Sequence, residues 1–132
     1  MSIKEMIREH PHVGSDFNEE LAEAVRHAMY CAAICNSCAD ACSAEDMDMA
    51  ACIRLCMDCA DICTATYRVA SRRTSGNVRV IEAQLRTCIP ACEACAIECE
   101  KHDHPHCRRC AKMCRECARD CQIALEGMFA AG

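Results

Sequence analysis

The sequence predicts an all-α protein: an antiparallel up-down-up-down four-helix bundle with a Cys-lined core, plus a short N-terminal helical arm. Three observations support this prediction. The pattern C-x3-C-x2-C-x3-C occurs four times within 132 residues. Its spacing puts the four cysteines of each pattern within about 60° on one helix face, at roughly 100° per residue. No stretch alternates apolar and polar residues like a strand, and turn-forming residues separate the patterns.

Sixteen of the seventeen cysteines belong to these patterns. Each pattern forms one stripe of thiols about 16 Å long, because a helix rises about 1.5 Å per residue. The seventeenth, Cys107, precedes the last pattern. The four stripes consist of Cys31, Cys35, Cys38, Cys42; Cys52, Cys56, Cys59, Cys63; Cys88, Cys92, Cys95, Cys99; and Cys110, Cys114, Cys117, Cys121.

Residues 1–14 are expected to form the arm, a short helix that ends before Pro11 and Gly14. Residues 15–132 are then the Cys-rich bundle. Ser15 or Asp16 is the expected N-cap of the first long helix, which should run from about residue 17 to about residue 44. The arm lies outside the repeated pattern.

The acidic segment 44–48 is the expected first turn, and the second long helix should run from about Met49 to Ala70. Ser75-Gly76-Asn77 then interrupts the chain. Both connections are short, which makes consecutive helices antiparallel.

The third long helix is expected from about residue 78 to residue 101, with a bend at Pro90, because proline removes one hydrogen bond of the helix. The His-rich segment 102–106 is the expected third turn. The fourth helix should continue to about Glu126, with Gly127 as the stop.

The first and third turns share one end of this bundle, so the stripes can be stacked from that end into layers. The predicted layers are Cys42/Cys52/Cys99/Cys110, then Cys38/Cys56/Cys95/Cys114, then Cys35/Cys59/Cys92/Cys117, then Cys31/Cys63/Cys88/Cys121. Beyond the last layer the same faces continue as an apolar plug of Tyr67, Ala70, Ile81, Leu85, Leu125 and Met128.

Composition excludes several classes of protein. The net charge of −5 argues against a nucleic-acid partner, which would need a basic surface. No run of about 18 apolar residues predicts a membrane span. The charged first 20 residues lack the apolar core of a secretory signal, which favours a cytoplasmic location. In that reducing compartment so many cysteines point to metal or redox chemistry and away from a disulfide scaffold. Helical i,i+4 neighbours are also too far apart for good disulfides.

Soft thiolates select Cu(I), zinc or iron–sulfur clusters. Zinc takes four ligands, so four layers would hold about four ions. Each such site carries a net charge of −2, and the stripes offer no lysine or arginine to balance it, which makes zinc costly. Cu(I) balances one thiolate per ion. Charge therefore favours many Cu(I) ions, roughly one per Cys. A zinc buffer and an iron–sulfur or thiol-redox protein remain the alternatives. A redox enzyme needs only one or two reactive thiols, however, so four equivalent cysteine patterns favour the binding of many metal ions over catalysis.

The patterned segments and the His-rich turn before the last of them resemble the bacterial copper storage proteins, in particular the cytosolic branch without an export signal. The segments read CAAICNSCADAC, CIRLCMDCADIC, CIPACEACAIEC and CRRCAKMCRECARDC. The resemblance spans roughly residues 17–126. It implies a non-enzymatic store of Cu(I), assembled as a homotetramer. We also expect it to exchange copper with a donor or acceptor, either a chaperone or a small thiol.

The bundle end formed by the first and third turns is the expected route of ion uptake, and we call it the mouth. Its expected ligands are His102, His106, Cys107 and Met49, because imidazole, thioether and thiolate all bind copper. Carboxylates there, such as Glu45, would attract cations. The roles of Met47 and His104 stay open. His27 continues the first stripe at the other end, where it is expected to be a core residue, partnered by Tyr67, more often than a ligand.

Overall fold

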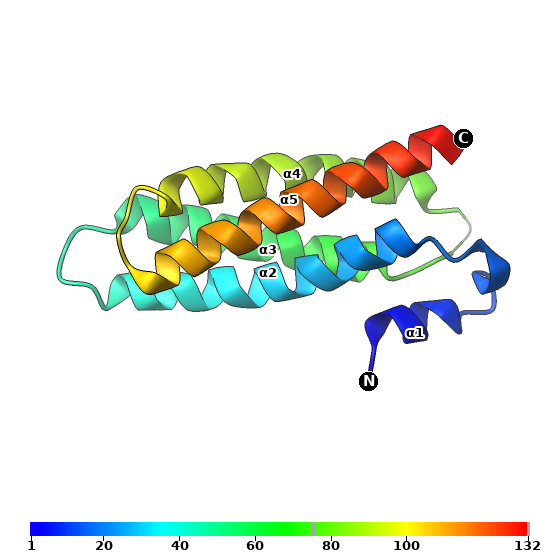
Figure 1. Cartoon of the computed structure of the whole chain (residues 1–132), viewed down its shortest axis with the longest axis horizontal. Helices are drawn as coiled ribbons and strands as arrows, with labels where there is room; N and C mark the ends of the chain where they lie inside the picture. Colours follow the sequence, from blue (N-terminus) through cyan, green and yellow to red (C-terminus); the bar gives the residue numbers. More distant parts are fainter. Residues whose placement is uncertain (75, 132) are drawn as a thin grey trace.

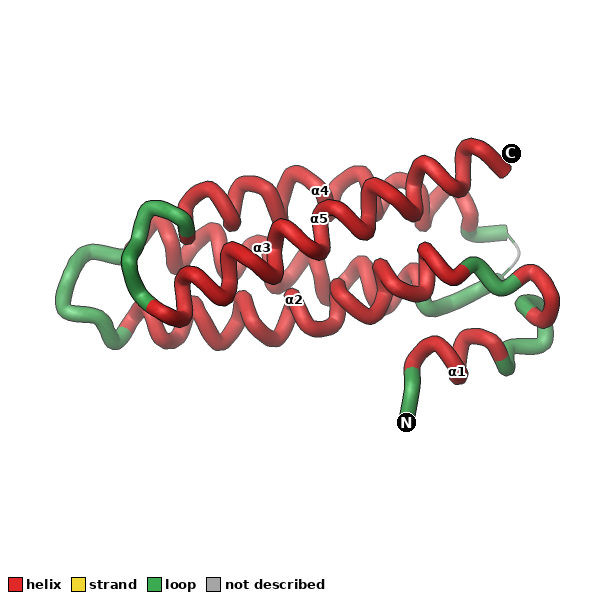
Figure 2. Tube along the Cα trace, viewed as in Figure 1, coloured by secondary structure: helices red, strands yellow, loops and turns green. Residues whose placement is uncertain are grey.

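A computed structural model of the protein describes residues 1–74 and 76–131, the last three by their backbone only. Four long helices lie side by side (Figure 1). They are α2 (Glu19–Ser43), α3 (Ala50–Ala70), α4 (Val78–Cys99) and α5 (Pro105–Ala131). The described residues contain no strand (Figure 2). No helix in this part of the chain is long and apolar enough to cross a membrane.

Consecutive helices run antiparallel, as predicted. α2 packs against α3 and α5, and α4 packs against the same two helices, so the four form a closed ring around one interior. The α2–α3 and α4–α5 connections lie together at one end, the mouth (Figure 1). The N-terminal arm and the α3–α4 connection lie at the other end.

The N-terminal segment differs from the prediction in its helix caps. α1 (Ile3–Arg8) begins at Ser2, whose hydroxyl accepts a hydrogen bond from the amide of Glu5, and a short 3-10 helix, η1 (Gly14–Asp16), follows. The predicted N-cap, Ser15 or Asp16, is therefore wrong. Asn18 caps α2 instead, because its Oδ1 accepts a hydrogen bond from the amide of Leu21 at 3.0 Å. Asparagine caps helices as well as serine or aspartate.

The prediction that Gly127 stops the last helix is also wrong. α5 continues through Gly127 to Ala131, and the φ angle of Gly127 is not in the left-handed region that a glycine stop needs. α4 is continuous through Pro90, whose predicted bend remains a prediction. Gly76 and Asn77 precede α4 as expected, while Ser75 lies outside the described residues.

The interior is built from sulfur and small side chains. All seventeen cysteines are buried, and alanines on each helix flank them, among them Ala32, Ala60, Ala96 and Ala118. Thr66 is the one buried polar or charged side chain in the described part of the chain, apart from the thiols. Small flanking residues allow the helices to approach closely, so that thiols from facing helices can meet.

An apolar plug closes the end opposite the mouth, as predicted. Ala70, Ile81, Leu85 and Leu125 are buried there, and Tyr67 and Met128 are partly buried. Leu21 and Val25 of α2 complete the plug, although the sequence interpretation did not include them.

Candidate metal centre

Each long helix turns one thiol stripe into the interior because its cysteines recur at the helical period. All seventeen thiols are free. For fifteen of them, all except Cys117 and Cys121, the contacts between neighbouring sulfur atoms span 3.5 Å (Cys35 to Cys114) to 4.0 Å (Cys52 to Cys56). Those distances are well beyond the 2.05 Å of a disulfide bond. The interior therefore presents a dense column of unbonded sulfur ligands.

The four flat layers predicted from the sequence are wrong for α5. The sequence interpretation paired Cys110 with Cys42, yet Cys110 lies 3.7 Å from Cys35 and 3.9 Å from Cys56. Cys107, in the first turn of α5, is the thiol beside Cys42, at 3.9 Å. Cys110 and Cys114 are thus paired about one thiol deeper than predicted, because α5 begins early enough for Cys107 to occupy the outermost position.

The sulfur atoms form overlapping sets instead of separate layers. In each set the potential ligand atoms lie within 4.8 Å of one another. From the mouth inward, the thiol sets include Cys38/Cys56/Cys99/Cys110, Cys35/Cys95/Cys110/Cys114, Cys31/Cys35/Cys59/Cys114 and Cys31/Cys59/Cys63/Cys92. Neighbouring sets share one or two sulfur atoms. A metal ion can therefore pass from one set to the next while keeping part of its coordination.

The outermost set combines three thiols with an imidazole. Cys38, Cys42, Cys107 and His106 form it. The Nδ1 of His106 lies 3.3 Å from the sulfur of Cys38 and 3.6 Å from that of Cys107. The hydrogen bond to Cys38 raises the pKa of His106, with a smaller contribution from Glu45. Burial raises the pKa of Cys107 to about 12.

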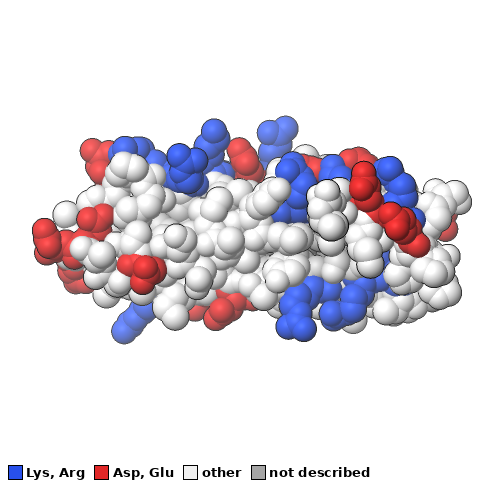
Figure 3. Space-filling model, turned by 90° about the horizontal axis from the view of Figure 1, so that it is seen from below, with Lys and Arg blue, Asp and Glu red and all other residues white. Residues whose placement is uncertain are grey.

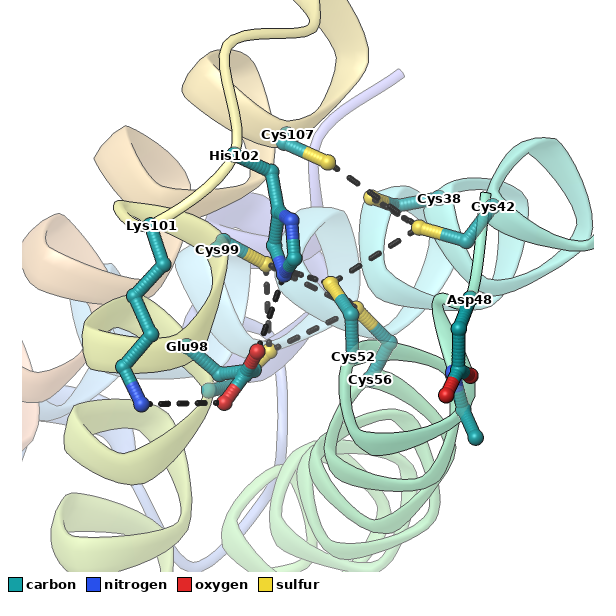
Figure 4. A network of polar contacts seen from close by, with 12 residues as sticks. Cys38, Cys42, Asp48, Cys52, Cys56, Glu98, Cys99, Lys101, His102 and Cys107 are labelled. Carbon is teal, nitrogen blue, oxygen red and sulfur yellow. Dashed lines mark hydrogen bonds and ion pairs between the residues drawn. The ribbon is translucent and has the colours of Figure 1, made fainter. Parts of the chain in front are cut away.

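Figure 4 shows how two thiols of this set lead inward, from Cys107 through Cys42 to Cys52. Cys52 in turn lies 3.7 Å from Cys99. The contacts cross from α5 to α2, then to α3 and α4, so all four helices contribute sulfur at the mouth.

The other residues predicted at the mouth have different surroundings. His102 donates a hydrogen bond from Nε2 to the carboxylate of Glu98 at 2.9 Å, and this contact lowers the pKa of Glu98. His104 stacks on His106, with ring centroids 5.5 Å apart. Met49 is buried at the N-terminus of α3, whereas Met47 is 56% exposed.

Two carboxylates, those of Glu45 and Glu98, contact the histidines of the mouth, and the sequence alone did not predict these contacts. Glu45 Oε2 lies 2.8 Å from His106 Nε2 and 3.2 Å from His104 Nδ1. Metal-binding histidines commonly have such a carboxylate on the second ring nitrogen, which fixes the orientation of the ring. The partner of His102 could have been found from the sequence, because Glu98 lies four residues earlier, at the end of α4, within reach of a side chain in the turn that follows.

His27 is partnered differently from the prediction. Its imidazole contacts Asp120 of α5 and, at 3.2 Å, Glu23 one turn earlier on α2. Tyr67 is not among its partners. These contacts use both ring nitrogens, so His27 here links two helices through carboxylates.

The mouth is also the acidic end of the molecule. Red side chains gather over that end in Figure 3, where the α2–α3 connection carries Glu45, Asp46 and Asp48. A negative potential at the opening raises the local concentration of cations. Soft ligands inside and negative charge outside together suit a soft cation.

A helical bundle that encloses a continuous column of thiols is typical of one class of protein, the metal-thiolate proteins that bind many metal ions. The family model for copper storage proteins matches residues 17–126. The chain belongs to the copper storage protein family.

Solved structures of similar proteins agree in fold. The copper storage protein Ccsp of Streptomyces lividans, loaded with 10 copper equivalents, is 41% identical, with 96% of this chain and 99% of that chain covered and a TM-score of 0.90. Apo-Csp3 of Bacillus subtilis is 34% identical, with 78% and 96% covered and a TM-score of 0.69. An uncharacterized cysteine-rich protein of B. subtilis, YhjQ, is 51% identical over 35 residues, which span 32% of its length.

Proposed function

We propose that this protein is a cytoplasmic copper store that holds many Cu(I) ions, roughly one per Cys, on the thiolates of its interior. The observation that carries the proposal is the unbroken series of overlapping sulfur sets from the mouth to Cys63 and Cys92. The copper-loaded state of the similar S. lividans protein supports it. Storage needs capacity and no reacting substrate, and we propose no enzymatic activity.

The charge of the lining supports Cu(I) over zinc. Within the described residues, no lysine or arginine is buried in the interior to offset an anionic site. Four zinc ions on sixteen thiolates would leave a charge of −8 there, from −2 at each site. One Cu(I) per thiolate leaves a neutral interior, so it avoids the cost of buried uncompensated charge.

Uptake is proposed to begin at the mouth, on the set formed by Cys38, Cys42, His106 and Cys107. This set is the outermost one, and His106 and Cys107 are held at its edge. His102 and Met49 are proposed as further ligands that meet copper before it moves inward. The shared sulfur atoms of the deeper sets supply the path.

The bundle of residues 15–132 is proposed to be the storage unit, with residues 1–14 as an arm that contributes no thiol. Homotetrameric assembly, and exchange of copper with a chaperone or small thiol, are proposed from the family resemblance.

An anaerobic titration of the reduced protein with Cu(I), in competition with a chromophoric Cu(I) chelator, tests the proposal. Saturation well above eight ions per chain, close to the number of cysteines, is the expected result. Saturation near four ions, or failure to compete with the chelator, would contradict it and favour a zinc buffer. A brown protein as isolated, with iron and acid-labile sulfide, would favour the iron–sulfur alternative.

A further inference from the structure

A pocket of about 280 Å³ lies at the end of the bundle opposite the mouth. It is surrounded by the connection between α1 and α2, by Arg73 after the end of α3, by the start of α4 and by Met128 near the end of α5. Leu21 and Ile81 form part of an apolar wall, and Arg73, Asp16 and His12 bring polar groups. Its volume is about nine times the roughly 30 Å³ that one water molecule occupies, so it is large enough for a small organic molecule.

Arg73 gives this pocket an uncompensated positive charge. Its Nε donates a hydrogen bond to the carbonyl of Ala70 at 3.2 Å, while its Nη2 is buried and has no hydrogen-bond partner among the described residues. No ion pair in the described part of the chain joins Arg73 to a carboxylate. Partial burial lowers the pKa of Arg73, which reflects the same cost. A buried guanidinium nitrogen without a hydrogen-bond partner requires an explanation.

Other arginines of this protein show what Arg73 lacks. Arg115 forms a two-pronged ion pair with Glu100, and Arg26 pairs with Glu23. Arg72, the neighbour of Arg73 in sequence, is exposed to solvent. Arg73 is thus partly buried and lines the pocket, and one of its guanidinium nitrogens has no hydrogen-bond partner among the described residues.

We propose that this pocket binds a small apolar monocarboxylate. The planar guanidinium of Arg73 matches the two oxygens of a carboxylate. The apolar group of the ligand would lie against Leu21 and Ile81. The exposed carboxylate of Asp16 at the rim disfavours ligands that carry more than one negative charge, because like charges repel.

The pocket is separate from the copper site. Ile81 lines it, Leu85 is one helical turn further along α4, and the first thiol of that stripe, Cys88, follows. All three side chains are buried. The apolar plug therefore lies between the ligand and the thiols, and occupancy of the pocket should leave the copper stoichiometry unchanged. The inference does not rest on the proposed function.

Ligand-observed NMR titrations of the reduced apoprotein with 4-methylpentanoate test the proposal. We expect saturable binding, and no binding of the uncharged 4-methylpentanamide, which has the same shape. Arg73→Gln should weaken binding at least about tenfold, since hydrogen bonds to charged groups are worth roughly that much. Arg72→Gln removes a neighbouring exposed arginine and should leave the affinity unchanged.

Three results would overturn the proposal: no saturable binding of 4-methylpentanoate, equal binding of the amide, or equal affinity in Arg73→Gln. Displacement of the carboxylate by equimolar chloride or inorganic phosphate would also overturn it, because the pocket would then be a general anion site. The comparison of acid and amide uses the unmodified protein, so it decides the matter even if Arg73→Gln does not fold.

Discussion

Glu23 is one of two carboxylates of α2 that tie the arm to the bundle, the other being Glu19. The carboxylate of Glu23 accepts a hydrogen bond from Arg26 at 2.5 Å and pairs with Lys4 of α1. These contacts, the one to Arg26 first, lower the pKa of Glu23 to about 2. A carboxyl group with a lowered folded-state pKa stabilises the fold above its ordinary pKa, and this stabilisation is lost as the pH falls toward the folded-state value.

We therefore expect Glu23→Gln to destabilise the apoprotein by about 1 kcal/mol at pH 7, the scale of a partly solvated ion pair. The difference from the unmodified protein should stay nearly constant down to about the ordinary pKa of 4.5, shrink as the pH falls further, and vanish below about pH 2. Urea unfolding at several pH values measures it. Glu19→Gln is the matched control, because Glu19 also pairs with Lys4 but is 61% exposed. A constant difference from pH 7 to pH 2 would contradict the expectation.

The mouth residues can be tested together. We expect a variant that combines His102→Ala, His106→Ala and Cys107→Ser to take up Cu(I) from a chelator several-fold more slowly. Its capacity should also fall by a few ions, because the outermost ligand set is lost. Stopped-flow absorbance and a stoichiometric titration measure the two effects. A control variant, His10→Ala with His12→Ala, removes two imidazoles at the other end and should change neither. Unchanged rate and capacity in the mouth variant would exclude the proposed route.

At the scale of whole helices, Gly127 offers a direct test of the end of α5. It lies within the helix, where glycine is less favourable than alanine. A Cβ atom there would lie 2.8 Å from Glu20 Oε2, the end of a flexible exposed side chain that can move away. Gly127→Ala should therefore stabilise the apoprotein by about 0.5 kcal/mol, which raises the unfolding midpoint by about 2 °C.

Gly14→Ala provides the contrast, since Gly14 has a φ of +45° in η1, a conformation that costs other residues about 1 kcal/mol. It should lower the midpoint. Circular dichroism melts of the two reduced variants in the presence of a chelator compare them. If Gly127→Ala were as destabilising as Gly14→Ala, α5 would end where the sequence alone predicted.

The helices and their inward faces could be predicted from the sequence, but the register between helices could not. The 3.6-residue period decides which side of a helix carries the thiols. The level at which Cys110 meets Cys38 or Cys42 depends on where α5 begins, and a few residues of turn shift it by a whole thiol. The same uncertainty at helix ends explains the missed cap at Asn18 and the missed last turn after Gly127.

For the molecule as a whole, the interior should gain metal without gaining charge. Burial raises the pKa of Cys42 and of Cys107, so these thiols are protonated at neutral pH. Hydrogen bonds from neighbouring thiols, together with burial, also raise the pKa of deeper thiols such as Cys63, whereas a hydrogen bond with Cys114 lowers the pKa of Cys31. A Cu(I) ion that binds a protonated thiol displaces one proton, so loading through protonated thiols leaves the net charge of −5 unchanged at every stage.

We expect pH-stat titration of the reduced protein to record about one proton released per Cu(I) until saturation, with an unchanged isoelectric point in the loaded protein. Because protons compete for the same sulfur atoms, the affinity for Cu(I) should fall as the pH is lowered, by about tenfold per pH unit for each thiolate that binds an ion. Zn²⁺ provides the contrast: four protons released for two positive charges gained would shift the isoelectric point downward. Release of about four protons per Cu(I), or a shifted isoelectric point, would mean that the column of thiols does not load as a neutral copper-thiolate core.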